Sequence, residues 1–163
     1  MKKRVVILAL ALMLACTAGL SAFGIGLQAD GNAGASFTTG VSLTVKFDSV
    51  PFVLAANWYL GDNVQNVGLT GDYWLFNKPI TRVGDGSLNW FLGLGLFANM
   101  RFENNFDLDA GLRVPFGLNM LLADNVFEPY VQIAPSFSVN VVPSLSVGNV
   151  FFPISAGFRI WFR

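Results

Sequence analysis

The most constraining feature of the sequence is an alternating pattern of side chains over residues 106–122. Every second residue there is apolar, whereas the three charged residues, Asp107, Asp109 and Arg113, all fall on the intervening positions. Side chains repeat with period two in a β-strand and with period 3.6 in an α-helix. The run therefore predicts a strand with one apolar face and one polar face.

The same alternation recurs along most of the chain. It predicts eight strands, at residues 23–30, 40–47, 52–60, 67–76, 89–102, 106–122, 127–141 and 154–163. Residue types that favour turns separate them, at 48–51, 61–63, 77–79, 84–86, 103–105, 123–125 and 143–149. An even number of strands returns a single-chain membrane barrel to its starting side. The sequence thus predicts an all-β fold, an eight-stranded antiparallel up-and-down transmembrane β-barrel over residues 23–163.

Prolines interrupt this pattern, since Pro115, Pro129 and Pro135 lie within predicted strands and Pro153 directly precedes the last one. A proline lacks the N–H group that a strand donates to its neighbour. We therefore expect bulges or strand ends near these four residues.

The direction of the two faces decides between two kinds of barrel. A soluble barrel turns its apolar residues inward, whereas a membrane barrel turns them toward lipid. The chain is 53% hydrophobic and only 12% charged, and its polar face is rich in glycine and poor in lysine, unlike a solvated surface. These features favour the membrane barrel, with a lumen filled by a polar network of Lys46, Asp72, Arg101, Asp107, Asp109, Arg113, Glu128 and Arg159.

The first 22 residues have the composition of a secretory signal. Three cations follow Met1, an apolar run extends from Val5 to Leu20, and small residues surround a predicted cleavage site near Ala22. We expect residues 1–22 to be a signal peptide and the exported chain to reach the outer membrane. An alternative makes Cys16, the only cysteine, the lipid-bearing first residue of a lipoprotein.

The residues that catalysis usually requires are scarce. The chain has no histidine and, after cleavage, no cysteine, so a histidine base, a thiol nucleophile and a transition-metal site are poorly supported. Asp107 and Asp109 share a face and could form an acid/base pair, but the lumen network accounts for them better. The sequence predicts no enzyme activity, no metal and no cofactor.

Charge also bears on partners. Without the leader cations Lys2, Lys3 and Arg4, seven basic residues remain against ten acidic ones, which gives a net charge of −3. No basic patch favours nucleic acid.

Four stretches carry a resemblance to a known family: LTGDYWLFNKPI, LNWFLGLGLFA, GLRVPFGLNMLL and EPYVQIAPS, which begin at residues 69, 88, 111 and 128. Over residues 39–163 the chain resembles a spirochaetal family of small OmpX-like outer-membrane proteins, a domain of unknown function. The resemblance implies an eight-stranded barrel at the cell surface and no defined site residues. One departure is the final Arg163, because such barrels commonly end on an aromatic residue.

These observations predict a non-enzymatic outer-membrane barrel with a structural or surface-interaction role. Its expected partners are outer-membrane lipid, the barrel assembly machinery during biogenesis, and a host or extracellular protein at the loops near residues 31–38, 61–65, 103–105 and 143–149. Two alternatives stay open: a lipocalin-like periplasmic or lipid-anchored barrel that binds a hydrophobic ligand, and a small diffusion channel.

Overall fold

The computed structural model describes residues 22–33, 38–60, 65–102 and 106–162. It contains ten strands: β1 (Phe23–Ala33), β2 (Thr38–Phe47), β3 (Phe52–Leu60), β4 (Gln65–Val83), β5 (Gly86–Phe102), β6 (Phe106–Arg113), β7 (Phe116–Leu121), β8 (Phe127–Ile133), β9 (Ser136–Val142) and β10 (Ser146–Phe162). The predicted signal peptide lies outside the described residues except for Ala22. No helix in the described part of the chain is long and apolar enough to cross a bilayer.

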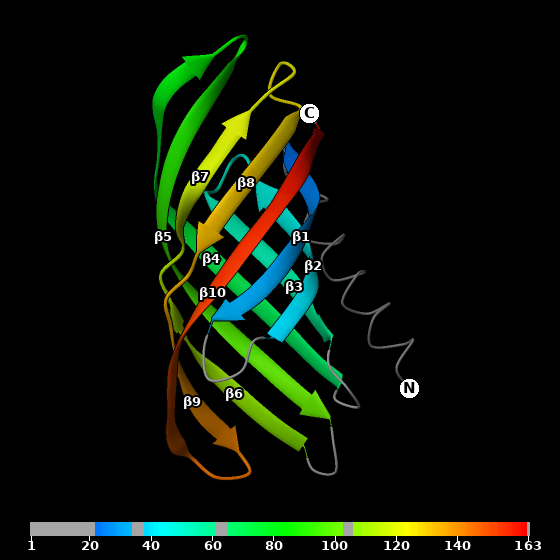
Figure 1. Cartoon of the computed structure of the whole chain (residues 1–163), viewed down its shortest axis with the longest axis vertical. Helices are drawn as coiled ribbons and strands as arrows, with labels where there is room; N and C mark the ends of the chain where they lie inside the picture. Colours follow the sequence, from blue (N-terminus) through cyan, green and yellow to red (C-terminus); the bar gives the residue numbers. More distant parts are fainter. Residues whose placement is uncertain (1–21, 34–37, 61–64, 103–105, 163) are drawn as a thin grey trace.

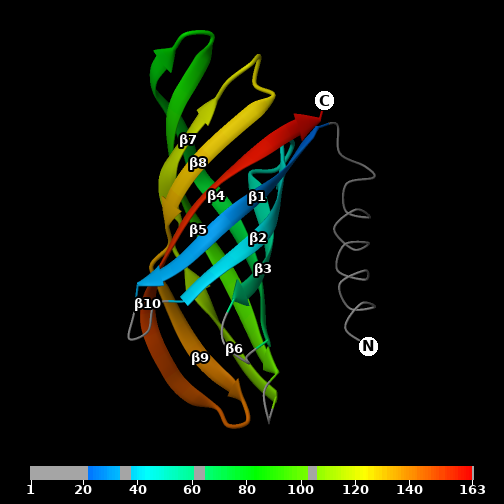
Figure 2. The same ribbon diagram turned by 45° about the vertical axis from the view of Figure 1, so that its right-hand side comes forward.

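The strands form a closed antiparallel ring. β1 pairs with β2 on one side and with β10 on the other, in a register that runs from Phe23↔Phe162 to Ala33↔Phe152. β6 and β7 both pair with β5, and β8 and β9 both pair with β10, so each of these two pairs of segments fills one position in the wall. The predicted eight-stranded up-and-down barrel is confirmed (Figure 1; Figure 2).

The barrel has two distinct ends. We call the end where β1 begins and β10 finishes the terminal side, and the opposite end the loop side. The turns after β2, β4 and β7 lie on the terminal side, where the hairpin of β4 and β5 projects beyond the neighbouring strands (Figure 1). The hairpin of β9 and β10 projects on the loop side, at the foot of the same view. The connections at 34–37, 61–64 and 103–105 fall outside the described residues.

Two predicted turns belong to strands instead. β4 continues through residues 77–79, where Asn77 and Lys78 pair with β5, and register shifts between Trp74 and Phe76 and between Pro79 and Thr81 accommodate the irregular residues. β10 begins at Ser146, inside the predicted turn 143–149. Both predictions were wrong because pairing with a long neighbouring strand outweighs the local turn preference.

The prolines mark a bend in the wall. Pro115 separates β6 from β7, and Pro135 separates β8 from β9, so both lie at strand ends as predicted. The backbone N–H groups of the residues before them donate to the carbonyls of Pro135 and Pro153, at 2.9 and 2.8 Å. The two breaks therefore lie side by side in adjacent strands, next to Pro153, which lies inside the continuous strand β10. Pro129 lies inside β8, just beyond the last pair of the β7–β8 ladder, Asn119↔Tyr130, where a missing donor is tolerated.

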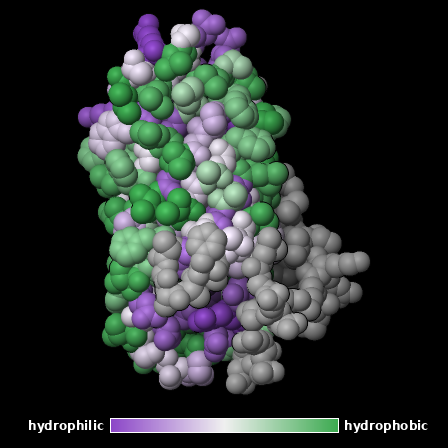
Figure 3. All heavy atoms as spheres, viewed as in Figure 1, coloured by the Kyte–Doolittle hydropathy of each residue, from purple (hydrophilic) through white to green (hydrophobic). Residues whose placement is uncertain are grey.

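The outer face of the barrel is apolar. Leu94, Leu96 and Leu112 are 55%, 63% and 62% exposed, and Phe158 is also exposed, so these side chains point away from the axis. Charged Arg113 and Arg159 are buried inside. Figure 3 shows hydrophobic residues spread over this face and hydrophilic residues gathered toward its ends. The predicted orientation, apolar outward and charged inward, is confirmed.

Aromatic rings also enter the lumen. The ring of Phe97 lies over Gly111, and that of Phe91 over Gly117, where an added Cβ would come within 2.8 and 2.6 Å of the ring atoms. Phe91 in turn stacks on Trp74 with 3.8 Å between ring centroids. The glycines of the polar face therefore make room for rings, and the lumen is packed by aromatic as well as ionic side chains.

Candidate functional site

The lumen concentrates the charges that the barrel buries. Among the described residues, six charged side chains are buried: Asp30, Lys46, Asp72, Arg113, Glu128 and Arg159. Three are cations and three are anions, so the buried set is formally neutral. This balance matters because an isolated charge in a low-dielectric interior is strongly destabilising, whereas hydrogen-bonded opposite charges compensate each other.

Glu128 organises the terminal half of the lumen. Its Oε1 accepts hydrogen bonds from Lys46 Nζ at 2.7 Å and Asn119 Nδ2 at 2.8 Å, and its Oε2 accepts one from Trp161 Nε1 at 2.8 Å. Arg159 Nη1 lies 3.6 Å from the same carboxylate. One fully buried anion thus holds four groups from the surrounding strands, which we call the Glu128 cluster (Glu128, Lys46, Asn119, Arg159 and Trp161).

Aromatic faces complete the surroundings of the two cations. Lys46 Nζ lies 3.9 Å from the ring centroid of Trp74, and the guanidinium of Arg159 lies 3.8 Å from that of Tyr130. Cation–π attraction of this kind is stronger where water is excluded. The hydroxyl of Tyr130 donates a hydrogen bond to Gln28 Oε1 at 2.7 Å. The terminal half of the lumen is therefore filled with packed side chains.

A second ion pair lies on the loop side of this cluster. Arg113 Nε is 3.2 Å from Asp72 Oδ1, and both side chains are buried. Arg113 also lines a cavity beyond it. Asp72 therefore faces the Arg113 side chain that forms part of the cavity wall.

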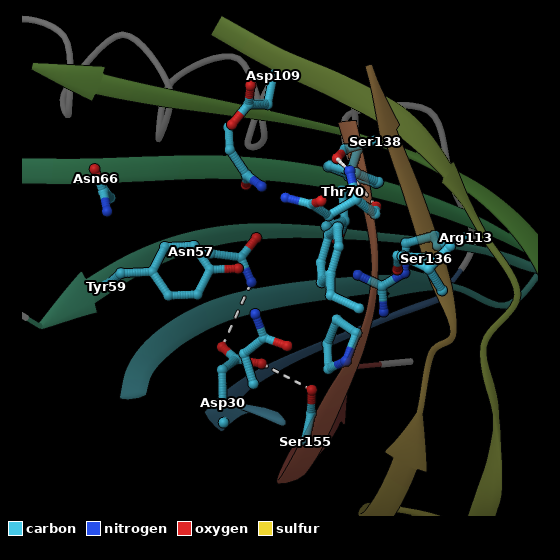
Figure 4. Close-up of a pocket in the computed structure, with 18 of the residues that line it drawn as sticks. Asp30, Asn57, Tyr59, Asn66, Thr70, Asp109, Arg113, Ser136, Ser138 and Ser155 are labelled. Atoms are coloured by element: carbon cyan, nitrogen blue, oxygen red, sulfur yellow. Dashed lines mark hydrogen bonds between the residues drawn. The ribbon is translucent and has the colours of Figure 1, made fainter. Parts of the chain in front are cut away.

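The loop half of the lumen is hollow. It contains a cavity of about 580 Å³, lined mainly by amides and hydroxyls from β1, β3, β4, β5, β9 and β10 (Figure 4). At its side, Asp30 accepts hydrogen bonds from Gln28, Ser42, Asn57 and Ser155. The prediction of a lumen filled throughout is wrong for this half, because small serine and asparagine side chains occupy the inner positions where the terminal half has Trp, Arg and Lys.

The predicted lumen residues divide into two groups. Lys46, Asp72, Arg113, Glu128 and Arg159 are buried inside the barrel. The other three, Arg101, Asp107 and Asp109, lie near the loop-side rim. The half-exposed Arg101 donates from Nη2 to Asp109 Oδ2 at 2.5 Å, and Asp107 lines a smaller adjoining pocket. The rim group does not join the Glu128 cluster, because long strands carry it to the opposite end of the lumen.

Sequence reasoning missed several inner residues. Asp30 ends the predicted strand 23–30, and its place on the inner face follows from the alternation of that strand. Trp161 was not among the predicted lumen residues, yet its ring is buried and its N–H donates to Glu128. Its position two residues after Arg159, on the same face of the last strand, is the signal that could have identified it.

In the ranges that the structure describes, no three His, Cys, Asp or Glu side chains come together as a metal site. The buried carboxylates Asp72 and Glu128 each face a cation. Each of these two buried carboxylates is therefore compensated by an opposite charge.

Comparison with known proteins gives similarity at the level of structure. No protein-family model matches the chain, and no curated protein matches it. A major outer membrane protein from Thermus thermophilus is similar over 87% of this chain and 100% of its own, with 11% identity and a TM-score of 0.41. Neisserial surface protein A (NspA) is similar over 86% and 96%, with 13% identity and a TM-score of 0.43. The N-terminal β-barrel domain of Pseudomonas aeruginosa OprF is similar over 88% and 98%, with 11% identity and a TM-score of 0.36.

Proposed function

We propose that the chain is an integral outer-membrane β-barrel with a non-enzymatic, structural or surface-interaction role. The observation that carries the proposal is the division of faces: large apolar side chains cover the outside of a closed ring, while six buried charges balance inside it. A closed ring leaves no unpaired strand edge, which a hydrocarbon environment requires. The proposal includes a relationship to the spirochaetal family of small OmpX-like proteins that the sequence resembles.

The two alternative functions fit the lumen less well. A lipocalin-like carrier of a hydrophobic ligand needs an apolar interior, whereas this cavity is lined by amides, hydroxyls and charged groups. A diffusion channel needs a continuous path, whereas the Glu128 cluster packs the terminal half. We expect the barrel to show no steady conductance in planar lipid bilayers, and stable single-channel steps would favour the channel.

The proposed partners follow from the two ends of the barrel. Lipid contacts the apolar outer face, and the assembly machinery engages the barrel during insertion. On the loop side, the hairpin of β9 and β10 presents Leu145 and Val147, each 79% exposed, to an extracellular or host protein. Exposed apolar side chains at a projecting hairpin are suited to contact with a partner.

Cysteine labelling tests the location and the orientation together. Ser144, between β9 and β10, and Asp85, between β4 and β5, lie at opposite ends of the barrel. In Gram-negative cells that express the full chain, a membrane-impermeant maleimide should label the Ser144→Cys variant on intact cells. It should label Asp85→Cys only after the outer membrane is permeabilised. The parent chain is the blank, because its one cysteine, Cys16, lies in the predicted leader.

Equal labelling of both sites on intact cells, or labelling of neither site before cell lysis, would contradict the proposal. Heat-modifiable migration in gel electrophoresis should accompany membrane insertion, because a closed barrel resists detergent until it is heated. A chain recovered in the soluble periplasmic fraction would overturn the outer-membrane assignment.

A further inference from the structure

The loop-side cavity has the chemistry of a small-molecule site. Its volume of about 580 Å³ lies within the ~300–1,000 Å³ range of small-molecule pockets. The wall combines polar groups with three aromatic rings, those of Tyr59, Phe97 and Phe151. Phe97 and Phe151 meet edge to face, with 5.4 Å between centroids.

The charged groups of the cavity wall are already partnered. Asp30 receives four side-chain hydrogen bonds, Arg113 faces Asp72, and Arg101 pairs with Asp109. The lining charges Asp30, Asp109, Arg101 and Arg113 also sum to zero. The wall therefore provides no free charge of either sign for an ionic ligand.

Neutral acceptors remain without partners. The amide oxygens of Asn32, Asn57 and Asn66 are buried at the atomic level and accept no hydrogen bond from the protein. Asn57 is itself 3% exposed, and its amide nitrogen donates to Ser42 at 2.7 Å, which fixes the orientation of the amide. Figure 4 shows Asn57, Tyr59 and Asn66 on one side of the cavity, opposite Arg113 and Ser136. A buried acceptor is stabilised when a donor reaches it.

We propose that this cavity binds an uncharged, polyhydroxylated ligand, a sugar of one or two rings. Each hydroxyl of a sugar can donate to an amide oxygen and accept from a serine or threonine hydroxyl. The apolar C–H face of a sugar ring fits against the aromatic rings of the wall. Ionic ligands are disfavoured, because they would enter a neutral wall whose charges are committed to one another. The site is separate from the surface-interaction role proposed above.

Nuclear magnetic resonance of the full chain, folded in lipid nanodiscs, tests this assignment directly. The probes are glucose, maltose and maltoheptaose, with gluconate and glucosamine as charged analogues of similar size. Glucose or maltose should shift the side-chain amide resonances of Asn57 and Asn66 saturably, and the two charged analogues should bind at least about tenfold more weakly. If maltoheptaose binds with the affinity of maltose, the ligand of the cavity is the end of a longer glycan. If maltoheptaose does not bind, the ligand is a free sugar.

Three variants locate the binding. Thr70→Phe fills the cavity from β4, and Asn66→Leu removes an unpartnered amide oxygen, so each should weaken sugar binding by about tenfold or more, the effect of losing one or two hydrogen bonds. Leu69→Val alters the outer face of the same strand and should leave binding unchanged. Heat-modifiable migration shows whether each variant folds. If Thr70→Phe does not fold, Asn66→Leu, which lies near the rim, still tests the site.

Three results would overturn the inference. If no sugar causes a saturable shift of the side-chain amide resonances, the cavity holds water only. Charged analogues that bind as well as glucose would refute a neutral site. Sugar binding that persists in folded Asn66→Leu and Thr70→Phe would place the binding elsewhere. None of these results bears on the outer-membrane location, which the cysteine labelling tests separately.

Discussion

Replacement of Glu128 by glutamine probes the packing of the terminal half of the lumen. The side chain keeps its shape, but it loses the charge that faces Lys46 at 2.7 Å and Arg159 at 3.6 Å. Both cations are almost entirely buried, with side-chain exposures of 8% and 1%, so water cannot screen them. Breaking a buried ion pair from one side destabilises a protein by about 3–5 kcal/mol. We expect Glu128→Gln to lower the free energy of unfolding by that amount.

The measurement is urea unfolding of the barrel in lipid vesicles, followed by tryptophan fluorescence. Trp74 and Trp161 both lie beside Lys46 and report on this region directly. Asp124→Asn is the matched control, because it makes the same chemical change at an exposed turn residue with φ of 54°, a conformation that asparagine tolerates. The control should change stability by less than about 0.5 kcal/mol.

A double variant separates charge imbalance from lost packing. Adding Lys46→Met to Glu128→Gln removes one of the two uncompensated cations. The double variant should therefore be more stable, by about 1–3 kcal/mol, than the sum of the two single effects predicts. If Glu128→Gln matched the Asp124→Asn control, or if the two single effects simply added, the cluster would not be held together by charge and the reasoning would be refuted.

Further predictions test the outer face, the ring closure and the indole contact. Leu94→Arg places a charge on the lipid side and should destabilise the barrel in vesicles by about 2–4 kcal/mol, measured by urea unfolding. An unchanged urea midpoint would contradict the assignment of Leu94 to the lipid face. Gly26→Val should abolish heat-modifiable migration, because a Cβ there clashes with the carbonyl oxygen of Phe158 across the β1–β10 closure, whereas Ala29→Val on the outer face should migrate normally. Trp161→Phe removes the N–H donor to the buried carboxylate and should cost about 1–3 kcal/mol, and a smaller effect in the same unfolding assay would show that the hydrogen bond contributes little.

Much of the fold was predictable because strand alternation is a local property. The run 106–122 indicated its lipid and lumen faces correctly, and Pro115 within it marked the break between β6 and β7. The extent of β4 was not predictable, because Asn77 and Lys78 favour a turn locally and are held in the strand only by pairing with β5.

The candidate site was less predictable than the wall. The sequence assigned Lys46 and Arg101 alike to the inner face, yet they lie in different halves of the lumen. Their separation depends on strand tilt and length, and neither is encoded in the alternation. The cavity was missed for a related reason: it exists where small inner residues of several strands fall at one level, which only the assembled register shows.

By itself, the sequence determined that strands form, that they close in an even number, and which face of each carries the charges. Those properties follow from alternation and turn chemistry within about ten residues. Only the tertiary structure decided which inner groups meet. Glu128 reaches Lys46 across 82 residues of sequence, and Asp30 reaches Ser155 across 125. Both contacts arise because closing the ring sets the stagger of every strand, and the stagger decides which side chains share a level of the lumen.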